Sequence, residues 1–365
     1  MDIKTIFRSM VDSGASDIFF KVGSSVNFRI DGLLKPQDKD PLGEKDLMKM
    51  IDEVLDEGQK KVFEDLREID FAINVEGIGR FRGSIFHQDG MPGAVFRHIK
   101  GKIQAFDELN LPSKVLTKLS VEKRGLILVT GATGSGKSTT IASIIEYINQ
   151  NLPSHIVTIE DPIEFTFTDK KSLIEQRELG IDTPSYLDAL KHVMYQSPDV
   201  IFIGNIRDQE TMTAAMNAAE TGQLVVSTIH SVNATQTVER IVNFYPPYQH
   251  EEIRMQLSLL LKGVIAQRLV PIKDGKGRIP ACEIMLLTPT ISALIREGKT
   301  NELLHYIEEG NLFGMQTFDQ CLAKFFLEKK ISVEDARRFC DSEAILELAL
   351  KGIKRTERGT PFSGR

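Results

Sequence analysis

The stretch Gly125-Leu-Ile-Leu-Val-Thr-Gly-Ala-Thr-Gly-Ser-Gly-Lys-Ser-Thr139 decides the fold of this chain. Its first part, Leu126–Val129, is apolar at every position, which is typical of a strand buried on both faces of a parallel sheet. The glycines that follow accept backbone angles closed to other residues, so the peptide N–H groups of this loop can point at one anion. A helix over residues 139–148 would add its positive N-terminal end. Strand, loop and helix in this order predict a binding site for a nucleoside triphosphate.

The loop has the spacing of a phosphate-binding loop that ends in a lysine and a hydroxyl residue. We expect Lys137 to reach the β and γ phosphates as a positive charge, and the Ser138 hydroxyl to bind Mg²⁺. ATP and Mg²⁺ are therefore the predicted cofactors. The predicted nucleotide-binding residues are Gly131, Ala132, Thr133, Gly134, Ser135, Gly136, Lys137, Ser138 and Thr139.

The composition is typical of a soluble globular protein, with 41% hydrophobic and 26% charged residues. A length of 365 residues is too great for one ordinary core and predicts two domains. The net charge of −6 gives no general electrostatic footprint for nucleic acid. We therefore expect no nucleic-acid partner.

Neither a signal peptide nor a membrane helix is expected. Residues 1–14 carry acids and lack a long apolar run, so they predict an amphipathic helix. No segment approaches the roughly eighteen consecutive apolar residues of a membrane span, which favours a cytoplasmic location. Cys282, Cys321 and Cys340 lie far apart without a CxxC pair, so we expect reduced, partly buried thiols and neither a disulfide framework nor a zinc site.

Residues 1–100 are predicted to form a small α+β domain, because several short segments alternate apolar and polar residues as half-buried antiparallel strands do. These predicted strands are residues 16–22, 26–30, 69–75, 79–86 and 94–99. Residues 101–119 are assigned to a linker.

Residues 120–288 are predicted to form an α/β nucleotide-binding core with a mostly parallel sheet. After the first strand, its expected strands are residues 156–160, 200–204, 224–228 and 263–269, of which the last could also begin as a helix. Residues 289–353 are predicted to be helical, over 291–297, 301–309, 317–328, 333–339 and 343–350. The basic tail, residues 354–365, is predicted to be disordered.

Four further segments point to a family. Three of them end predicted core strands and carry polar side chains there, and the fourth lies in the helical region. They are Ile159–Phe165, Val200–Asp208, Gln223–His230, and Leu294–Thr300 followed by Gly314–Gln320. Together with the loop, they resemble the secretion-type hexameric ATPases, and most closely the type IV pilus retraction ATPases, PilT and its paralogue PilU, over nearly the whole chain.

This resemblance implies a RecA-like P-loop core, an N-terminal PAS-like α+β domain and a C-terminal helical extension. It also implies a homo-hexamer, or a mixed ring with a PilT-like paralogue. The ring would lie at the cytoplasmic face of the inner membrane, against a pilus platform protein. ATP turnover would there drive pilus retraction, the removal of pilin subunits that powers twitching motility.

The family assigns activation of the attacking water to the residue matched here by Glu164. Glu160 and Asp161 lie close by, and the resemblance suggests that they are linked to Mg²⁺ through water. Open α/β sheets bind ligands at this end of their strands. The alternative is an ordinary solvated strand exit.

The resemblance also places Arg80, Arg82 and Arg97 of the first domain at the γ-phosphate of a neighbouring subunit. The alternative is that these arginines pair with carboxylates on an exposed strand face. His230 matches the family's histidine box and would sense the γ-phosphate. A purely structural histidine is the alternative.

Four departures from the family pattern each remove a charge or a proton carrier. Asn205 replaces the glutamate after the third strand, and Gln223 replaces the first histidine of the histidine box. The family's Leu-Arg is Met194–Tyr195 here, and Ser292 replaces an arginine of the C-terminal motif. We hypothesise that the chain binds ATP but hydrolyses it slowly, or only alongside a more active paralogue.

The sequence leaves three other functions open. A nucleotide-binding ring subunit without significant turnover would differ from a motor in its steady-state hydrolysis. A type II secretion or pilus-extension ATPase is disfavoured because the family's four-cysteine zinc motif is missing. A nucleic-acid motor lacks support from charge or from stacking aromatic residues.

Overall fold

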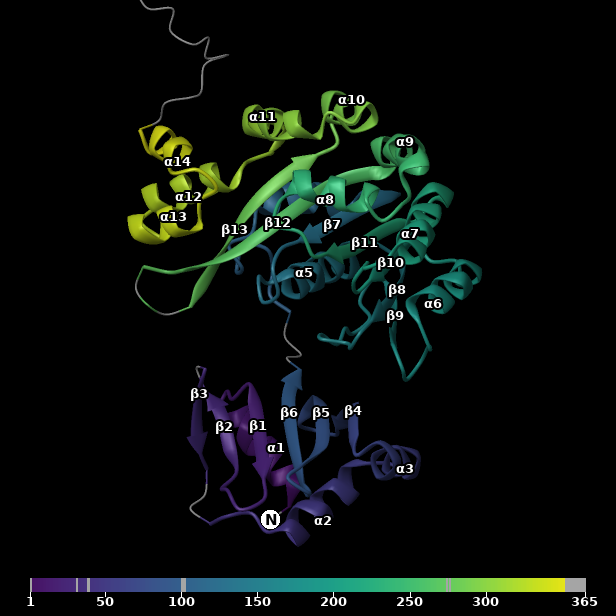
Figure 1. The fold of residues 1–365 in the computed structure, drawn as a ribbon, viewed down its shortest axis with the longest axis vertical. Coiled ribbons are helices and arrows are strands. Elements are labelled where there is room, and N and C mark those ends of the chain that lie inside the picture. Colours follow the sequence, from purple (N-terminus) through teal and green to yellow (C-terminus); the bar gives the residue numbers. More distant parts are fainter. Residues whose placement is uncertain are drawn as a thin grey trace, which may run out of the picture. The chain divides into compact units, whose positions relative to one another are not determined.

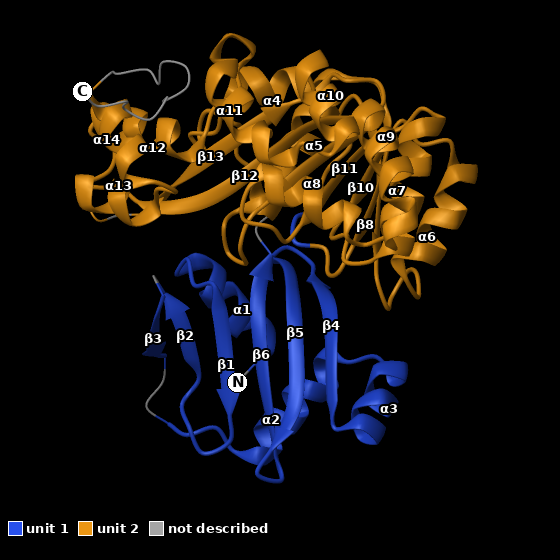
Figure 2. Ribbon diagram, turned by 45° about the horizontal axis from the view of Figure 1, so that its top comes forward, with its two compact units in different colours: residues 1–102, 164–166 blue, residues 103–163, 167–365 orange. Residues whose placement is uncertain are grey.

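The structure, a computed structural model, describes residues 2–30, 32–37, 40–99, 103–273, 275 and 277–351. The chain divides into two compact units (Figure 2): residues 1–102 with 164–166, and residues 103–163 with 167–365. The predicted tail, residues 354–365, lies outside the described residues. Within the described parts of the chain, no helix combines the length and the apolar character that crossing a lipid bilayer requires.

The first unit contains a six-stranded antiparallel sheet with the order β3-β2-β1-β6-β5-β4 (Figure 1). All five strands predicted in residues 1–100 are confirmed. The sequence did not indicate β3, because its four residues are exposed and show no alternation of apolar and polar side chains. The strands are β1 (Asp17–Lys21), β2 (Asn27–Ile30), β3 (Leu33–Pro36), β4 (Glu68–Val75), β5 (Gly79–Gln88) and β6 (Met91–Ile99).

The predicted amphipathic N-terminal helix is confirmed as α1 (Ile3–Asp12). It begins at the cap Asp2, whose carboxylate accepts the N–H of Lys4. Its apolar side packs on the sheet, where Phe7 stacks on Phe81 of β5 with the ring centroids 4.3 Å apart. Two more helices complete this unit, α2 (Glu44–Val54) and α3 (Glu57–Leu66).

The second unit contains a seven-stranded sheet with the order β13-β12-β7-β11-β10-β8-β9. Six strands run parallel and β13 pairs antiparallel with β12. Every predicted core strand is confirmed, and the ambiguous segment 263–269 lies within a strand. The strands are β7 (Gly125–Thr130), β8 (His155–Glu160), β9 (Leu173–Glu178), β10 (Val200–Ile203), β11 (Leu224–Ile229), β12 (Leu261–Pro271) and β13 (Arg278–Leu286).

The sequence did not indicate β9 or β13, and both are edge strands. The β9 sequence, Leu-Ile-Glu-Gln-Arg-Glu, is mostly polar, because an edge strand keeps one side toward solvent. Pro280 lies inside β13, and proline is tolerated at a sheet edge, where its missing N–H breaks no ladder.

Helices cover both faces of this sheet, because the chain crosses it in opposite directions. The step from β7 to β8 runs toward one edge, whereas the steps from β10 to β11 and from β11 to β12 run toward the other. Since such crossovers are right-handed, α5 lies on one face and α7 and α9 on the other. The helices are α4 (Ser113–Ser120), α5 (Lys137–Asn151), α6 (Tyr186–Val193), α7 (Gln209–Thr221), α8 (Ala234–Val242) and α9 (His250–Leu260).

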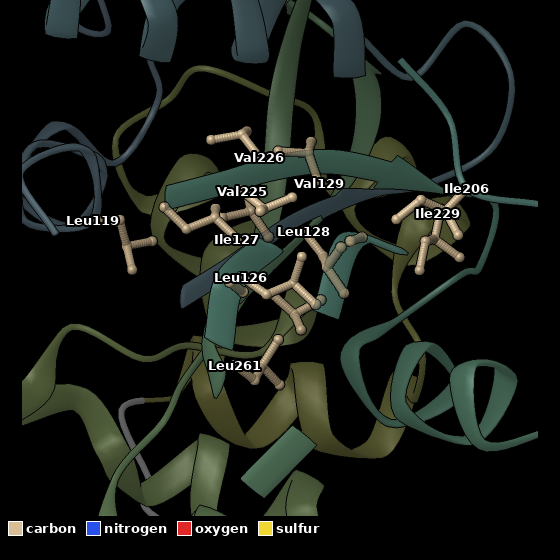
Figure 3. Packing of buried hydrophobic residues seen from close by; sticks show 14 of the residues in the cluster. Leu119, Leu126, Ile127, Leu128, Val129, Ile206, Val225, Val226, Ile229 and Leu261 are labelled. Atoms are coloured by element: carbon tan, nitrogen blue, oxygen red, sulfur yellow. The ribbon is translucent and has the colours of Figure 1, made fainter. Parts of the chain in front are cut away.

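The core of the second unit is centred on β7, all six residues of which are buried. Figure 3 shows Leu126–Val129 of this strand among Val225, Val226 and Ile229 of β11. Leu119 in the same figure comes from the segment assigned to the linker. Within residues 101–119, Phe106, Leu111, Val115, Leu116 and Leu119 are buried in this core, and α4 includes the last three.

The five predicted C-terminal helices are confirmed. They are α10 (Pro289–Glu297), α11 (Leu303–Glu309), α12 (Phe318–Leu327), α13 (Val333–Phe339) and α14 (Glu343–Leu350). The last three pack with the ends of β12 and β13 into a separate small core. The three cysteines are free thiols, of which Cys282 and Cys321 are buried and Cys340 is half-buried.

Candidate nucleotide-binding site

The predicted phosphate loop joins the carboxyl end of β7 to α5. Gly131, Gly134 and Gly136 have φ angles of 144°, 78° and 92°, which L residues with side chains rarely adopt. Gly136 is the N-cap of α5, so the helix begins at Lys137 rather than at Thr139. The glycines of the loop therefore have the conformation that the sequence predicted, whereas the helix begins two residues earlier than predicted and ends three residues later.

Close packing makes Gly131 indispensable. A Cβ atom at this position would lie 2.5 Å from the carbonyl oxygen of Gln267 and 2.5 Å from Oγ of Ser135. We expect Gly131→Ala to lower the free energy of unfolding by about 3 kcal/mol, because strain and overlap add. Gly134→Ala is the matched control, since nothing lies within 4 Å of its Cβ position and only about 1 kcal/mol of strain applies. Urea unfolding of both variants measures the difference, and equal losses would contradict this account.

Lys137 is almost fully buried, and its ammonium group lies over the loop. Its Nζ donates hydrogen bonds to the carbonyl oxygens of Gly131 and Ala132, both at 3.0 Å. The positive charge is thus held inside the turn of the loop. A phosphate cradled by this turn would meet both the ammonium group and the N-terminus of α5.

The carboxyl end of β8 carries two carboxylates in a row, of which Glu160 is buried and Asp161 is exposed. Oε1 of the buried Glu160 accepts hydrogen bonds from Oγ1 of Thr158 at 2.8 Å and from Nε2 of Gln176 at 3.1 Å. Asp161 follows directly and is exposed. The two predicted metal-linked carboxylates therefore lie at the carboxyl edge of the sheet.

Asn205 follows β10 and is 8% exposed. Oγ1 of Thr228, on the neighbouring β11, donates to the carbonyl oxygen of Gly204 at 2.7 Å and lies 3.4 Å from Oδ1 of Asn205. A Cβ atom on Gly204 would lie 2.8 Å from the hydroxyl of Tyr186, so Tyr186 of α6 packs directly against the residue that follows β10.

The charges at this edge influence one another. Burial raises the pKa of Tyr186, and the negative charge of Asp161 raises it further, whereas Arg207 opposes the change. Loss of solvent lowers the pKa of His230, and the positive charges of Lys137, Arg207 and Arg240 lower it further. His230 is therefore neutral at neutral pH and lies within the field of the loop lysine.

Sequence reasoning missed three of these side chains. Arg207 lies in a segment that matched the family, but no role was assigned to it. Tyr186 and Arg240 lie in helices that no motif had indicated, and only the fold brings them to the edge of the sheet. Their signal is electrostatic. Arg207 lowers the pKa of both Tyr186 and His230, Arg240 lowers that of His230, and Tyr186 has a raised pKa of its own.

The three predicted arginines lie on two paired strands of the first unit. Arg82 of β5 and Arg97 of β6 are opposite each other in register. Arg82 lies 3.7 Å from Asp70, and Nε of Arg97 donates to the buried carboxylate of Asp17 at 2.8 Å. Arg97 thus has a structural partner, in line with the alternative reading for that residue, whereas Arg82 forms only a loose, exposed pair.

Glu164 is exposed and groups with the first unit, as do Arg80, Arg82 and Arg97. The roles of these four residues at the phosphate loop stay predictions. The residues that the second unit itself brings together at the edge of the sheet are Lys137, Ser138, Glu160, Asp161, Asn205 and His230.

Comparison with protein families extends these observations. Residues 1–321 match the family described as "Type II/IV secretion system protein". The chain belongs to this family. The predicted resemblance is confirmed, and with it a fold made of a P-loop core, an N-terminal α+β domain and C-terminal helices.

Individual relatives cover almost the whole chain. It is 42% identical to the type IV pilus ATPase PilU of Pseudomonas aeruginosa over 351 residues, which are 96% of this chain and 92% of that protein. It is 41% identical to the pilus retraction ATPase PilT of the same organism, over 92% of this chain and 97% of that protein. A crystal structure of the pilus retraction motor PilT with bound ADP has a TM-score of 0.89 and 43% identity, and the match covers 95% of this chain and 99% of that one.

Proposed function

We propose that this chain is an ATPase of type IV pilus machinery that couples ATP hydrolysis to pilus retraction. The observation that carries this proposal is the phosphate loop with its buried Lys137, in a chain related to PilU and PilT over almost its full length. Both relatives are named as pilus ATPases.

Three residues at the edge of the sheet fit Mg²⁺, because each of them supplies an oxygen ligand. These are the hydroxyl of Ser138 and the carboxylates of Glu160 and Asp161, and Mg²⁺ prefers oxygen ligands. Glu160 is buried and held by two hydrogen bonds, so its carboxylate is already oriented. Bound Mg²⁺ would neutralise charge on the phosphates.

The protein groups would then act on the γ-phosphate and the attacking water. Lys137 and the N–H groups of Gly131–Thr139 bind the phosphate oxygens. Glu164 orients the water and accepts its proton. His230 is neutral beside Lys137, so it can accept or donate a hydrogen bond and register whether the γ-phosphate is present.

We further propose that the protein works as a ring of six, alone or mixed with a PilT-like paralogue. The ring would lie in the cytoplasm at the inner membrane, against a pilus platform protein. In a ring, arginines of one subunit can complete the site of the next, which is the role proposed for Arg80, Arg82 and Arg97.

A second function is favoured by Asn205. An amide cannot take up a proton or add negative charge where the family pattern has glutamate, so a nucleotide-binding accessory ring with little turnover is the alternative. Phosphate release from ATP and Mg²⁺, by the purified protein alone and mixed with a PilT-like paralogue, separates the two. Turnover by the protein alone supports the motor. No turnover by the protein alone, together with a mixture faster than the paralogue by itself, supports the accessory ring.

The proposed role of the arginines predicts complementation between two defective subunits. We expect Arg82→Ala to lower turnover about tenfold, because Arg80 and Arg97 would share its task. Mixing it with the Lys137→Ala variant should restore part of the activity, since the second variant supplies Arg82 to a neighbour with an intact loop. Phosphate release by the mixture measures this effect. No recovery in rings shown to contain both variants would contradict an arginine supplied by a neighbour.

A further inference from the structure

The loop that carries His230 is held by one row of residues that crosses the sheet. Thr130 of β7 is opposite Ala266 of β12, and Ala266 is opposite Glu283 of β13. Residues opposite each other on paired strands point to the same face. Thr130 and Glu283 therefore lie on the same face, at the carboxyl end of β7, next to the first glycine of the phosphate loop.

The two outer members of this row bind the two ends of the loop. Oγ1 of Thr130 donates to the carbonyl oxygen of Ser231 at 3.2 Å, directly after His230. Oε1 of Glu283 accepts the N–H of Ala234 at 2.8 Å, at the first residue of α8. The loop after His230 is thus fixed at one end to β7, the strand that leads into the phosphate loop, and at the other end to β13.

A hydroxyl pair closes the loop between these anchors. Oγ of Ser231 lies 2.6 Å from Oγ1 of Thr237, and Oγ1 of Thr237 lies 2.7 Å from the carbonyl oxygen of Asn233. All three groups are supplied by the loop or by α8 itself. Oγ1 of Thr237 also lies 3.5 Å from Oγ1 of Thr130, so Thr130 and Glu283 are the sheet residues that hold this loop and the start of α8.

Glu283 is an unusual choice for an anchor, because it is a buried carboxylate. Only 1% of it is exposed, and Oε2 has no hydrogen-bond partner in the described part of the chain. The N-terminus of α8 favours its negative charge. The other charged groups that face it are Arg268 of β12, Asp319 of α12 and Asp341.

We propose that Glu283 is a positioning residue for ATP hydrolysis: it fixes the start of α8 and, together with Thr130, the place of His230 at the nucleotide site. This inference rests on the proposed function and adds to it a residue that touches neither nucleotide nor metal. Since Glu283 lies on β13, this edge strand would take part in sensing the γ-phosphate, although it is far from the phosphate loop in the sequence.

The test compares two substitutions of similar length. Glu283→Gln keeps an oxygen that accepts the N–H of Ala234, whereas Glu283→Met fills the space without an acceptor. We expect Glu283→Met to lower kcat about tenfold with KM for ATP unchanged, and Glu283→Gln to keep at least about half of wild-type kcat. The double variant Glu283→Met with His230→Ala should be no slower than His230→Ala alone, because both changes remove the same contribution.

Hydrogen exchange separates this inference from the proposed function. Peptides covering residues 230–238 should exchange about tenfold faster in Glu283→Met than in wild type, and at the wild-type rate in Glu283→Gln. If the wild-type protein had no turnover, either alone or mixed with a PilT-like paralogue, the proposed function would fail, but this comparison would still decide whether Glu283 holds the loop. Unchanged exchange in Glu283→Met, or a double variant in which the two losses multiply, would overturn the inference.

A pH series distinguishes the carboxylate from a merely space-filling group. Burial raises the pKa of Glu283 to about 7, while the hydrogen bond from Ala234 opposes this change. Because the folded protein then holds the proton more tightly than the unfolded chain, this group costs stability as the pH rises from the ordinary carboxyl range to about 7. Glu283→Gln lacks this cost, so its Tm relative to wild type should rise by about 5 °C between pH 4.5 and pH 8. A Tm difference that does not change with pH would show that Glu283 is not held as a buried carboxylate at the start of α8, and would overturn the inference.

Discussion

Lys137→Ala is expected to lower ATP hydrolysis by about 10³-fold, since it removes a preorganised positive charge at the phosphates. In the folded protein the ammonium group is already inside the loop, 3.0 Å from two carbonyl oxygens of that loop. Bound phosphate would replace these carbonyls as the partner of Nζ, and little reorganisation is needed. Phosphate release at saturating ATP measures the effect on kcat, and nucleotide titration measures the effect on binding.

Two controls show whether the loss is chemical. Lys191→Ala removes an exposed lysine whose nearest carboxylate, Asp188, is 3.9 Å away, so turnover should not change. The Tm of Lys137→Ala measures what the loss of the two hydrogen bonds from Nζ to Gly131 and Ala132 costs in stability, so that a chemical loss is separated from unfolding. If Lys137→Ala kept more than a tenth of wild-type turnover, hydrolysis would not occur at this loop.

Asn205→Glu is expected to raise ATP hydrolysis by about 10²-fold, the usual scale of one electrostatic contributor in an active site. Asn205 lies at the carboxyl end of β10, between Glu160 on β8 and Thr228 on β11. A carboxylate here would add the negative charge near the metal that the family pattern contains.

Asn205→Gln is the matched control for this gain. It adds the same methylene to a residue that is only 8% exposed, but it brings no charge. We expect its turnover to equal that of wild type or to fall, because the added atoms crowd the edge of the sheet. If Asn205→Glu were no faster than Asn205→Gln, Asn205 would not limit the rate, and the slow step would lie elsewhere in the ring.

The sequence predicted most of the fold because its strongest signals are local. Buried parallel strands read as continuous apolar runs, and the phosphate loop has fixed glycine positions, so β7, β8, β10 and β11 were all predicted. The edge strands β9 and β13 gave no such signal for two different reasons. Polar residues make up most of β9, whereas Pro280 and Glu283 interrupt the apolar residues of the largely buried β13.

The candidate site divides in the same way. Lys137 and Glu160 could be predicted as site residues because each lies within a sequence motif. The structure has both at the carboxyl edge of the sheet. Tyr186 and Arg207 could not be given roles, because the pKa shifts that reveal them depend on distances between elements separated along the chain.

By itself, the sequence determined the P-loop core, the order of its strands along the chain and the family, because glycine spacing and apolar periodicity act between near neighbours. Only the tertiary structure decided which strands are adjacent, and with them the row of Thr130, Ala266 and Glu283. No local pattern encodes such a row. A buried carboxylate opposite a helix start is stable only when both have been brought together by the packing of the whole sheet.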